Sequence, residues 1–489
     1  MSHKVGIKRN LFYSFGYQLL EIILPLITAP YIARVLGANS LGIYSKTQAF
    51  AQYFFLFALL GVQNYGNRAI ARTRDDIVDR SKTFWEIYVF QILTAILSSL
   101  LYISYCLVFV NSNKIVYLLQ SVHIISAIFN INWFCFGMEK FRLTTIRGAC
   151  IRIISAVAIF IFVKKPEDLW LYTVIITAGQ LISVLAVWPF VIRHIRIMRP
   201  TWRGIKMHIK PNLVLFWPVI AVSLYNVMDK LMLGYFSSNE EVAFYSNAER
   251  IVTIPNTIIL ALDNVIMPRM SNLFAKENNS KEKIKYLMDN VMVFAMFMAA
   301  AMAFGVAGVS DVFAPWFYGK EFVRCGYFIL LLSPIIVFRG WAAVLRTQFI
   351  IPTGRDKIYV WSLTAGAVVN LIINSMLIPS MNGVGAIIGT LVAEFTVCFL
   401  QFFWCRKELD FKQYLTDGVS FCLIGLAMFF VVEALSHMGH KAIITLLIQV
   451  ACGGLFYVLA AGFYIIKIKR NPTIINVVLK MLRIKYRFR

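Results

Sequence analysis

The sequence predicts an all-α polytopic membrane protein that crosses the bilayer about 14 times. Apolar stretches of about 20 residues fill the chain from Asn10 to about Ile466, and each matches the ~30 Å hydrocarbon core at 1.5 Å of rise per helical residue. Of the 489 residues, 59% are hydrophobic and 15% are charged, and the mean hydropathy is +0.71. Soluble domains do not reach these values, so the composition excludes a soluble globular protein.

The expected elements are transmembrane helices joined by connections of about 5 to 20 residues, none of them long enough to hold a separate domain. The first apolar run follows a short basic start, but it has full spanning length and further spans follow it. We therefore interpret it as an uncleaved helix rather than a secretory signal. The predicted spans lie near residues 10–33, 41–65, 85–110, 115–136, 148–163, 169–192, 212–234, 251–270, 288–309, 327–349, 358–378, 384–404, 416–435 and 442–466.

The net charge of +24 follows this topology. With the amino terminus in the cytoplasm, about 36 of the 48 lysines and arginines fall in cytoplasmic segments, about 8 in outer segments and about 4 inside spans, as the positive-inside rule requires. Both termini are therefore expected in the cytoplasm, and nucleic acid is not an expected partner. The most basic segments are Arg193–Arg199 with Arg203, Lys206 and Lys210 beyond it, and the tail Lys467–Arg489, and we expect both to contact anionic lipid headgroups.

A duplication divides the chain at the basic stretch Arg193–Pro211. Two copies with an even number of spans have the same orientation, which places a site between them near the midplane, as in many transporters. We predict an N-terminal six-helix bundle at residues 1–198, a second bundle at 199–411, and two extra helices with a basic tail at 412–489. The halves share short motifs in the same order: Leu36-Gly37 with Leu233-Gly234, Tyr44-Ser45 with Tyr245-Ser246, and Arg68 with Arg269. The interval from Tyr44 to Arg68 and that from Tyr245 to Arg269 are both 24 residues.

Ionisable residues inside the spans are the candidate functional groups. Each costs about 2.5–3.5 kcal/mol at the centre of a membrane helix, so it tends to face a cavity or a partner. The alternative is that these charges pair with one another and only fix helix packing. The cations are Arg34, Lys46, Arg152, Lys230, Arg339 and Arg346, and the carboxylates that could couple transport to H⁺ or Na⁺ are Glu21, Asp229 and Glu394.

Motifs for nucleotides and metals are missing from the sequence. It contains no GxxxxGK[ST], no GxGxxG between a strand and a helix, and no CxxC. We therefore expect no cofactor and no bound metal. The energy for any transport should come from an ion gradient or from the gradient of the substrate itself.

The chain resembles the Wzx-type flippases of O-antigen and capsule repeat units, within the multidrug/oligosaccharidyl-lipid/polysaccharide exporter (MOP) superfamily. The clearest block is PLITAPYIARVLG at 25–37, followed by LGIYS at 41–45 and NYGNR at 64–68. Similar pieces recur as far as the twelfth span, including SLYNVMDK at 223–230, MPR at 267–269 and NLIIN at 370–374.

This resemblance implies a MATE-like, V-shaped pair of bundles in the bacterial plasma (inner) membrane. It also implies a transporter, not an enzyme, that moves undecaprenyl-diphosphate-linked oligosaccharides to the outer leaflet by alternating access, with coupling to H⁺ or Na⁺ left open. The six in-span cations then become candidates for the diphosphate or an acidic sugar. Polysaccharide polymerase and chain-length machinery are further partners under this hypothesis.

Two other functions remain open from the sequence. A MATE-like cation or drug antiporter would favour a net negative cavity, whereas the ionisable residues within the spans include slightly more cations than carboxylates. A membrane-embedded polysaccharide polymerase or ligase usually needs a large outer loop, whereas the longest outer segments predicted here, near residues 237–250 and 310–326, are short.

The topology can be tested with reporter fusions. Reporters placed after Arg199 and after Lys485 should both give a cytoplasmic signal, and one placed near Met381 should give an outer signal, because the lysine and arginine excess sets the orientation. A reversed signal at any of these three positions would contradict the predicted arrangement of spans.

Overall fold

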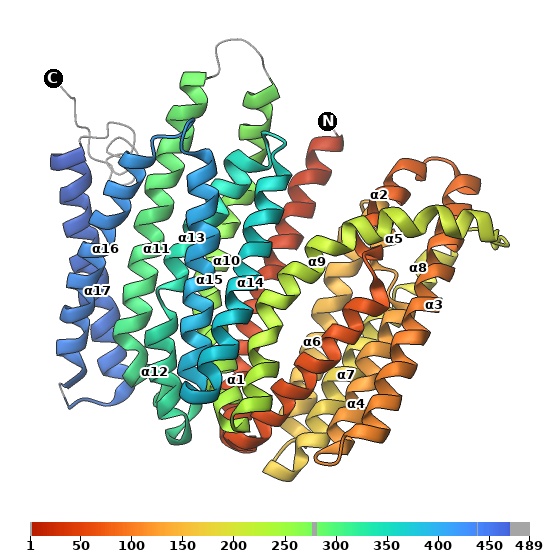
Figure 1. Ribbon diagram of the computed structural model, residues 1–489, viewed down its shortest axis with the longest axis horizontal. Coiled ribbons are helices and arrows are strands. Elements are labelled where there is room, and N and C mark those ends of the chain that lie inside the picture. The colour runs from red at the N-terminus through yellow and green to blue at the C-terminus, as the bar shows by residue number, and fades with distance from the viewer. Residues whose placement is uncertain (1, 276–280, 438, 470–489) are drawn as a thin grey trace. The chain divides into compact units, whose positions relative to one another are not determined.

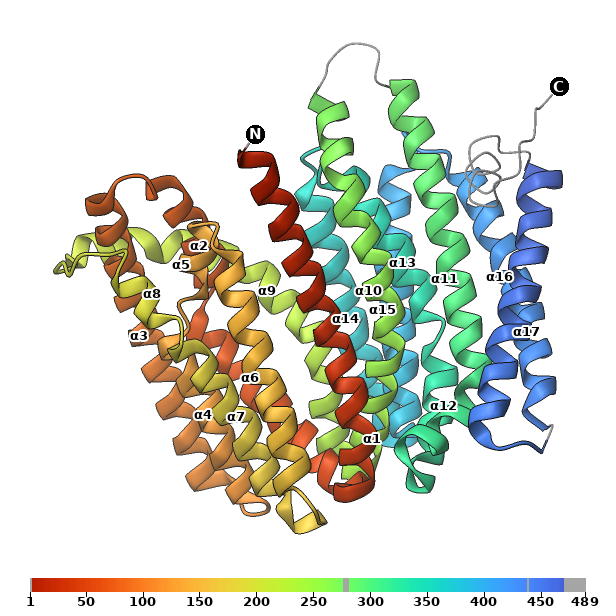
Figure 2. The same ribbon diagram turned by 180° about the vertical axis from the view of Figure 1, so that it is seen from behind.

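The computed structural model describes residues 2–275, 281–437 and 439–469, and this part of the chain contains helices and no strands. It forms two compact units, Met1–Ala243 (unit 1) and Phe244–Arg489 (unit 2). Figures 1 and 2 show the helices from opposite sides. The all-helical architecture confirms the predicted fold class. Helices suit a membrane because they satisfy their backbone polar groups within one segment.

Unit 1 begins with α1 (Ser2–Leu59), which contains Pro25 and Pro30 and breaks at Gly37 (φ 73°, ψ 173°). The predicted span 10–33 and most of the span 41–65 therefore belong to one element, which ends at Leu59, and the connection expected between them is a single break in the helix. Glycine allows this break because it has no Cβ and adopts a positive φ at little cost. In Figures 1 and 2 the chain reverses direction at the lower end of α1.

The other helices of unit 1 pack around two apolar cores. Phe84, Trp133 and Ile205 belong to the core between α2, α3, α5 and the start of α9, and Phe55 and Tyr102 belong to the core between α1, α3 and α4. The elements are α2 (Val62–Thr73), α3 (Ile77–Phe109), α4 (Lys114–Phe129), α5 (Asn132–Gly137), α6 (Phe141–Phe162), the 3₁₀ turn Pro166–Asp168, α7 (Leu169–Leu185), α8 (Trp188–Ile192) and α9 (Trp202–Phe236).

Unit 2 packs its helices around one large core that runs through α11, α13, α15, α16 and α17. Arg355, just before α14, donates two hydrogen bonds of 2.6 and 2.7 Å to Glu408, just after α15, and this carboxylate raises the pKa of Arg355. The helices are α10 (Asn239–Ala275), α11 (Lys281–Tyr318), α12 (Val323–Leu332), α13 (Ile335–Leu345), α14 (Asp356–Met381), α15 (Gly383–Cys405), α16 (Phe411–Ala434) and α17 (Ala442–Phe463). Shorter turns lie at Lys320–Phe322, Arg346–Ile350, Leu435–His437 and Tyr464–Lys469.

Most of the predicted spans correspond to a described helix that could cross a membrane. Ten helices are long and apolar enough to cross a membrane, or eleven if the bent pair Lys320–Leu332 and Ile335–Ile350 is one span. The three remaining predicted spans lie within α1 and α10, which are not among those ten. The division of the chain at 198 and 411 stays a prediction, and α9 packs within unit 1 against α1, α2 and α3.

Candidate functional site

Lys46 lies in the second part of α1 and extends to the end of α9. Its ammonium donates a hydrogen bond to the carbonyl oxygen of Gly234, and its stem lies against that glycine. A Cβ at position 234 would come within 2.7 Å of Lys46 Cδ, so a larger residue there would displace the lysine. The close approach of the two helices thus fixes where this half-buried cation lies.

A polar cavity of about 320 Å³ opens beside Lys46. It lies where the second part of α1, the α3–α4 connection and the start of α10 meet within unit 1. Across it, Asn239 Nδ2 donates to Asn39 Oδ1 at 2.9 Å. Most of its lining groups are amides and hydroxyls, which can donate and accept hydrogen bonds. The lining residues are Asn39, Ile43, Lys46, Thr47, Ser112, Asn113, Tyr117, Gly234, Ser237, Ser238, Asn239 and Glu240.

A second cavity of about 320 Å³ shares Lys46 and Tyr117 with the first. Its walls are mostly apolar and aromatic, with Phe50, Tyr105, Leu231, Met232, Tyr235 and Phe236 completing the lining. The ring of Phe50 lies 4.9 Å from that of Tyr105, centroid to centroid. Lys46 therefore stands between a hydrogen-bonding cavity and an aromatic one, and both belong to unit 1.

Asp229 and Lys230 lie one to two turns before Gly234 on α9. Asp229 is buried and close enough to Tyr53 of α1 to interact with it electrostatically. Tyr53 Oη also lies 3.4 Å from the carbonyl oxygen of Ser223. Lys230 is half-buried. Unit 1 therefore brings one predicted cation, Lys46, and one predicted carboxylate, Asp229, to the α1–α9 contact, and Lys230 follows Asp229 on α9.

In unit 2, Arg339 of α13 and Glu394 of α15 form an ion pair through Arg339 Nε and Glu394 Oε1. Their side chains are 19% and 5% exposed, respectively. The predicted anion-binding cation and the predicted coupling carboxylate are therefore partners of each other. Removing one member of such a pair leaves a charge without its partner in a poorly hydrated place.

The remaining predicted residues are Arg346 in unit 2 and Arg34, Arg152 and Glu21 in unit 1. Arg346 begins the π-helical segment Arg346–Ile350, and its guanidinium lies 5.2 Å from the centroid of the Tyr359 ring. Arg34 on α1 and Arg152 on α6 are exposed, and both interact with other described residues. The side chain of Glu21 lies outside the described part of the structure.

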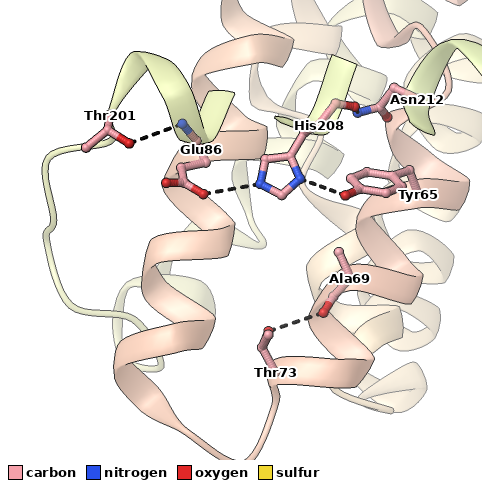
Figure 3. A network of polar contacts seen from close by, with 8 residues as sticks. Tyr65, Ala69, Thr73, Glu86, Thr201, His208 and Asn212 are labelled. Carbon is pink, nitrogen blue, oxygen red and sulfur yellow. Dashed lines mark hydrogen bonds and ion pairs between the residues drawn. The ribbon is translucent and has the colours of Figure 1, made fainter. Parts of the chain in front are cut away.

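A buried polar network holds the start of α9 against α2 and α3 (Figure 3). His208 Nε2 lies 3.2 Å from Glu86 Oε2, and His208 Nδ1 lies 2.7 Å from the hydroxyl of Tyr65. Both contacts are satisfied when Nε2–H donates to Glu86 and the Tyr65 hydroxyl donates to Nδ1. One turn on, Asn212 Nδ2 donates to the His208 carbonyl at 2.7 Å. The network positions α9, whose far end carries Asp229, Lys230 and Gly234.

Sequence reasoning missed the cavity amides and the His208 network. Asn39, Asn113 and Asn239 come from three separate segments, and polar residues at helix ends are too common to indicate a site by themselves. A lone histidine also gives little signal. A glycine near the start of a helix, Gly204, is a weak signal of a close contact, and in the structure a Cβ there would collide with the Glu86 carboxylate. Among the described residues, no group of three or more His, Cys, Asp or Glu could hold a metal.

A helical bundle in which ten or eleven described helices are long and apolar enough to cross a membrane, and in which an ion pair is buried, is typical of a membrane transporter. The family described as "Polysaccharide biosynthesis protein" matches residues 7–274, more than half of the chain, so the protein belongs to this family. The Putative O-antigen transporters of Shigella dysenteriae and Escherichia coli (strain K12) are each 21% identical to it. The alignments cover 79% and 83% of this chain and 97% and 98% of those proteins, respectively.

Solved structures share the fold. A lipid II flippase MurJ in an inward closed conformation matches with a TM-score of 0.77 at 16% identity, over 93% of this chain and 99% of that one. An inward-facing multidrug resistance MATE family transporter of the MOP superfamily matches with a TM-score of 0.61 at 14% identity, over 82% and 96%. The predicted resemblance to this superfamily is confirmed, and the relatives named above are transporters or flippases rather than enzymes.

The ion pair in unit 2 predicts a specific pattern of stabilities. Arg339→Ala should destabilise the purified protein by about 3–5 kcal/mol, because Glu394 keeps its buried charge without a partner. The double variant Arg339→Ala/Glu394→Gln should regain most of that loss. Thermal unfolding in detergent measures both, with Arg346→Ala as a control that removes a cation outside the pair. Equal stability of Arg339→Ala and the unmodified protein would contradict a structural role for the pair.

Proposed function

We propose that this protein flips undecaprenyl-diphosphate-linked oligosaccharide repeat units from the cytoplasmic to the outer leaflet of the bacterial plasma membrane. Two relatives, which align with this chain over nearly their whole length, carry the name Putative O-antigen transporter. The fold is similar to that of a flippase named for lipid II. A lipid-linked glycan needs such a protein, because each sugar hydroxyl placed in hydrocarbon without a partner costs several kcal/mol and a charged diphosphate costs far more.

The observation that carries the proposal is the pair of cavities at Lys46. The polar cavity offers amides and hydroxyls that can replace the water bound to a sugar, and the adjoining one offers aromatic side chains, whose faces pack against sugar rings. Lys46 stands between them and adds a cation for phosphate. A cation or drug antiporter would instead require mainly carboxylates there, and Glu240 is the only one among the described lining residues of either cavity.

The six predicted cations differ in how readily they could contact an anionic headgroup. Arg339 is already paired with a carboxylate that balances its charge, which weakens its attraction for an anionic headgroup. Lys46 donates to a neutral carbonyl, and an ammonium carries three donors, so it can add a phosphate contact without losing an ionic partner. We therefore rank Lys46 first and keep Arg34, Arg152, Lys230, Arg339 and Arg346 as secondary candidates.

Alternating access supplies the mechanism in this proposal. The three-part division at residues 1–198, 199–411 and 412–489 provides two six-helix bundles that can change their relation while the headgroup stays in a polar environment. Both termini lie in the cytoplasm in the proposed topology. Polysaccharide polymerase and chain-length machinery would take the flipped product in the outer leaflet.

Glycan export in cells that lack the protein or carry Lys46 variants tests this function. Deleting the protein should stop export of the glycan and cause lipid-linked oligosaccharide to accumulate in the cytoplasmic leaflet. Lys46→Met keeps the stem beside Gly234 but removes the charge, so it should lower export at least tenfold with little change in protein abundance. Lys46→Arg should keep part of the activity, because it retains the charge. Surface glycan and the accumulated lipid-linked precursor are the measured quantities.

Lys320→Ala is the matched control, because it removes an exposed lysine from a connection in unit 2 and should leave export unchanged. Normal export after deletion, together with increased sensitivity to cationic drugs, would contradict the flippase and favour the antiporter. Normal export in Lys46→Met alone would contradict only the assignment of Lys46.

Coupling to H⁺ or Na⁺ would rest on a carboxylate that binds the ion differently in the two states, since equal binding shifts nothing. Asp229 is our first candidate because it is buried in the α1–α9 contact, whereas Glu394 already binds Arg339 and the side chain of Glu21 is not described. In inside-out vesicles, Asp229→Asn should remove the dependence of translocation on an imposed gradient, and Asp356→Asn at the exposed start of α14 should not. Full gradient dependence in Asp229→Asn would exclude this role.

A further inference from the structure

The connection between α8 and α9 is fixed against the first turns of α3. Arg80 donates to the carbonyl oxygen of His194 from Nε at 3.0 Å and from a terminal nitrogen at 2.7 Å. The backbone N–H of Arg196 donates to Ser81 Oγ at 2.8 Å, and Trp85 Nε1 donates to the carbonyl of Arg196 at 3.0 Å. These bonds use backbone groups of the connection, so its own arginine side chains are left to project outward. Arg193, Arg196 and Arg199 are all exposed.

The first turns of α9 continue this surface. Gly204, Ile205, His208 and Asn212 share one face of the helix and are buried, with His208 held by Glu86 and Tyr65 (Figure 3). The opposite face carries Arg203, Lys206 and Lys210, all exposed. The two faces of this part of α9 therefore differ: the inner face is held by a buried polar network, and the outer face is cationic.

Large apolar side chains lie exposed among these cations. Ile197 is 92% exposed, Trp202 is 58% exposed and Met207 is 64% exposed. Lys206 Nζ lies 5.5 Å from the centroid of the Trp202 ring. In water such side chains would be unfavourable, whereas at a bilayer surface tryptophan and methionine enter the headgroup region while lysine and arginine reach the phosphates.

The charge of this surface is of one sign. From Leu169 to Met228 the sequence contains no Asp or Glu. The acidic group that lies under the helix, Glu86, is buried and bound to His208. The exposed Asp75 and Asp76 belong to the turn between α2 and α3, where Asp76 caps α3, and the exposed Asp79 lies in the first turn of α3. The outward face of residues 193–210 therefore presents six cations: Arg193, Arg196, Arg199, Arg203, Lys206 and Lys210.

We propose that this surface, residues 193–210 and hereafter the α9 surface, binds the anionic phospholipid headgroups of the adjacent leaflet. Continuity along α9 favours a lipid over an acidic protein or a nucleic acid. The same helix passes directly into an apolar segment whose Leu213, Val214 and Trp217 are exposed, and residues 202–223 are long and apolar enough to enter a membrane. The helical cations Arg203, Lys206 and Lys210 therefore lie about one to three turns before this apolar segment.

Lipid retention by the full-length protein tests the proposal. Detergent-purified protein is mixed with equal amounts of phosphatidylglycerol and phosphatidylcholine, and bound lipids are counted by native mass spectrometry. The unmodified protein should retain mainly phosphatidylglycerol. Each cation near an anionic surface contributes a preference of about fivefold, so R203Q/K206Q/K210Q should lower the preference by up to about 100-fold, and by less as salt screens it.

The triple variant R406Q/K407Q/K412Q is the matched control. It removes the same charge from exposed positions of the α15–α16 connection and should lower the preference far less. Hydrogen exchange in lipid nanodiscs gives a second readout, because amides of residues 202–212 should exchange more slowly with phosphatidylglycerol than with phosphatidylcholine, and only when the three cations are present. A protein that is not folded would show fast exchange throughout, so loss of folding is detected separately.

Equal retention of the two lipids by the unmodified protein would overturn the proposal and leave the α9 surface to an acidic protein partner. Equal loss of preference in the two triple variants would also overturn it, because net charge rather than this surface would then set the preference. Neither lipid is the oligosaccharide-bearing substrate of the proposed flippase, so the outcome is independent of that function.

Discussion

Hydrocarbon provides no hydrogen-bond partner and little solvation for charge, and this constraint shapes every part of the molecule. Backbone groups are satisfied within helices, which explains the absence of strands from the described residues. The same constraint favours partners for Arg339 and Lys46: Arg339 pairs with Glu394, and Lys46 donates a hydrogen bond to a backbone carbonyl. The cations of the α9 surface, by contrast, lie in a connection and in the first turns of a helix, where they are exposed.

The same constraint links the two cavities of unit 1 to the proposed function. A glycan headgroup crosses the membrane only if protein groups replace its water, and the cavities at Lys46 offer amides, hydroxyls, aromatic rings and one cation within a short stretch of α1, α4 and α9. The contacts of α1 with α9 and with the start of α10 depend on small residues. A Cβ at Gly42 would overlap the backbone of Asn239, and one at Gly234 would displace Lys46. The glycines that allow these close contacts therefore also determine where the Lys46 ammonium lies.

The sequence predicted the helices far better than the site, for physical reasons. Long apolar segments such as 384–404 have one stable structure in a bilayer, and α15 (Gly383–Cys405) matches that span closely. The junction at 34–40 was predicted as a connection because Gly37 alone does not indicate whether a helix stops or only turns. The Arg339–Glu394 pair joins residues 55 positions apart, and the cavity combines three segments of unit 1, so neither could be predicted from local spacing.

Translocation by the purified protein tests the central claim most directly. Proteoliposomes containing the protein and a lipid-linked oligosaccharide with a labelled sugar are exposed to an external glycosidase that cannot enter. We predict that the protein exposes the inner-leaflet half of the substrate to the enzyme much faster than protein-free liposomes do, and that liposomes with Lys46→Met protein fall near the protein-free rate. If cleavage stops at the outer-leaflet half with intact, folded protein present, the chain does not flip this class of lipid, and the proposed flippase function is wrong.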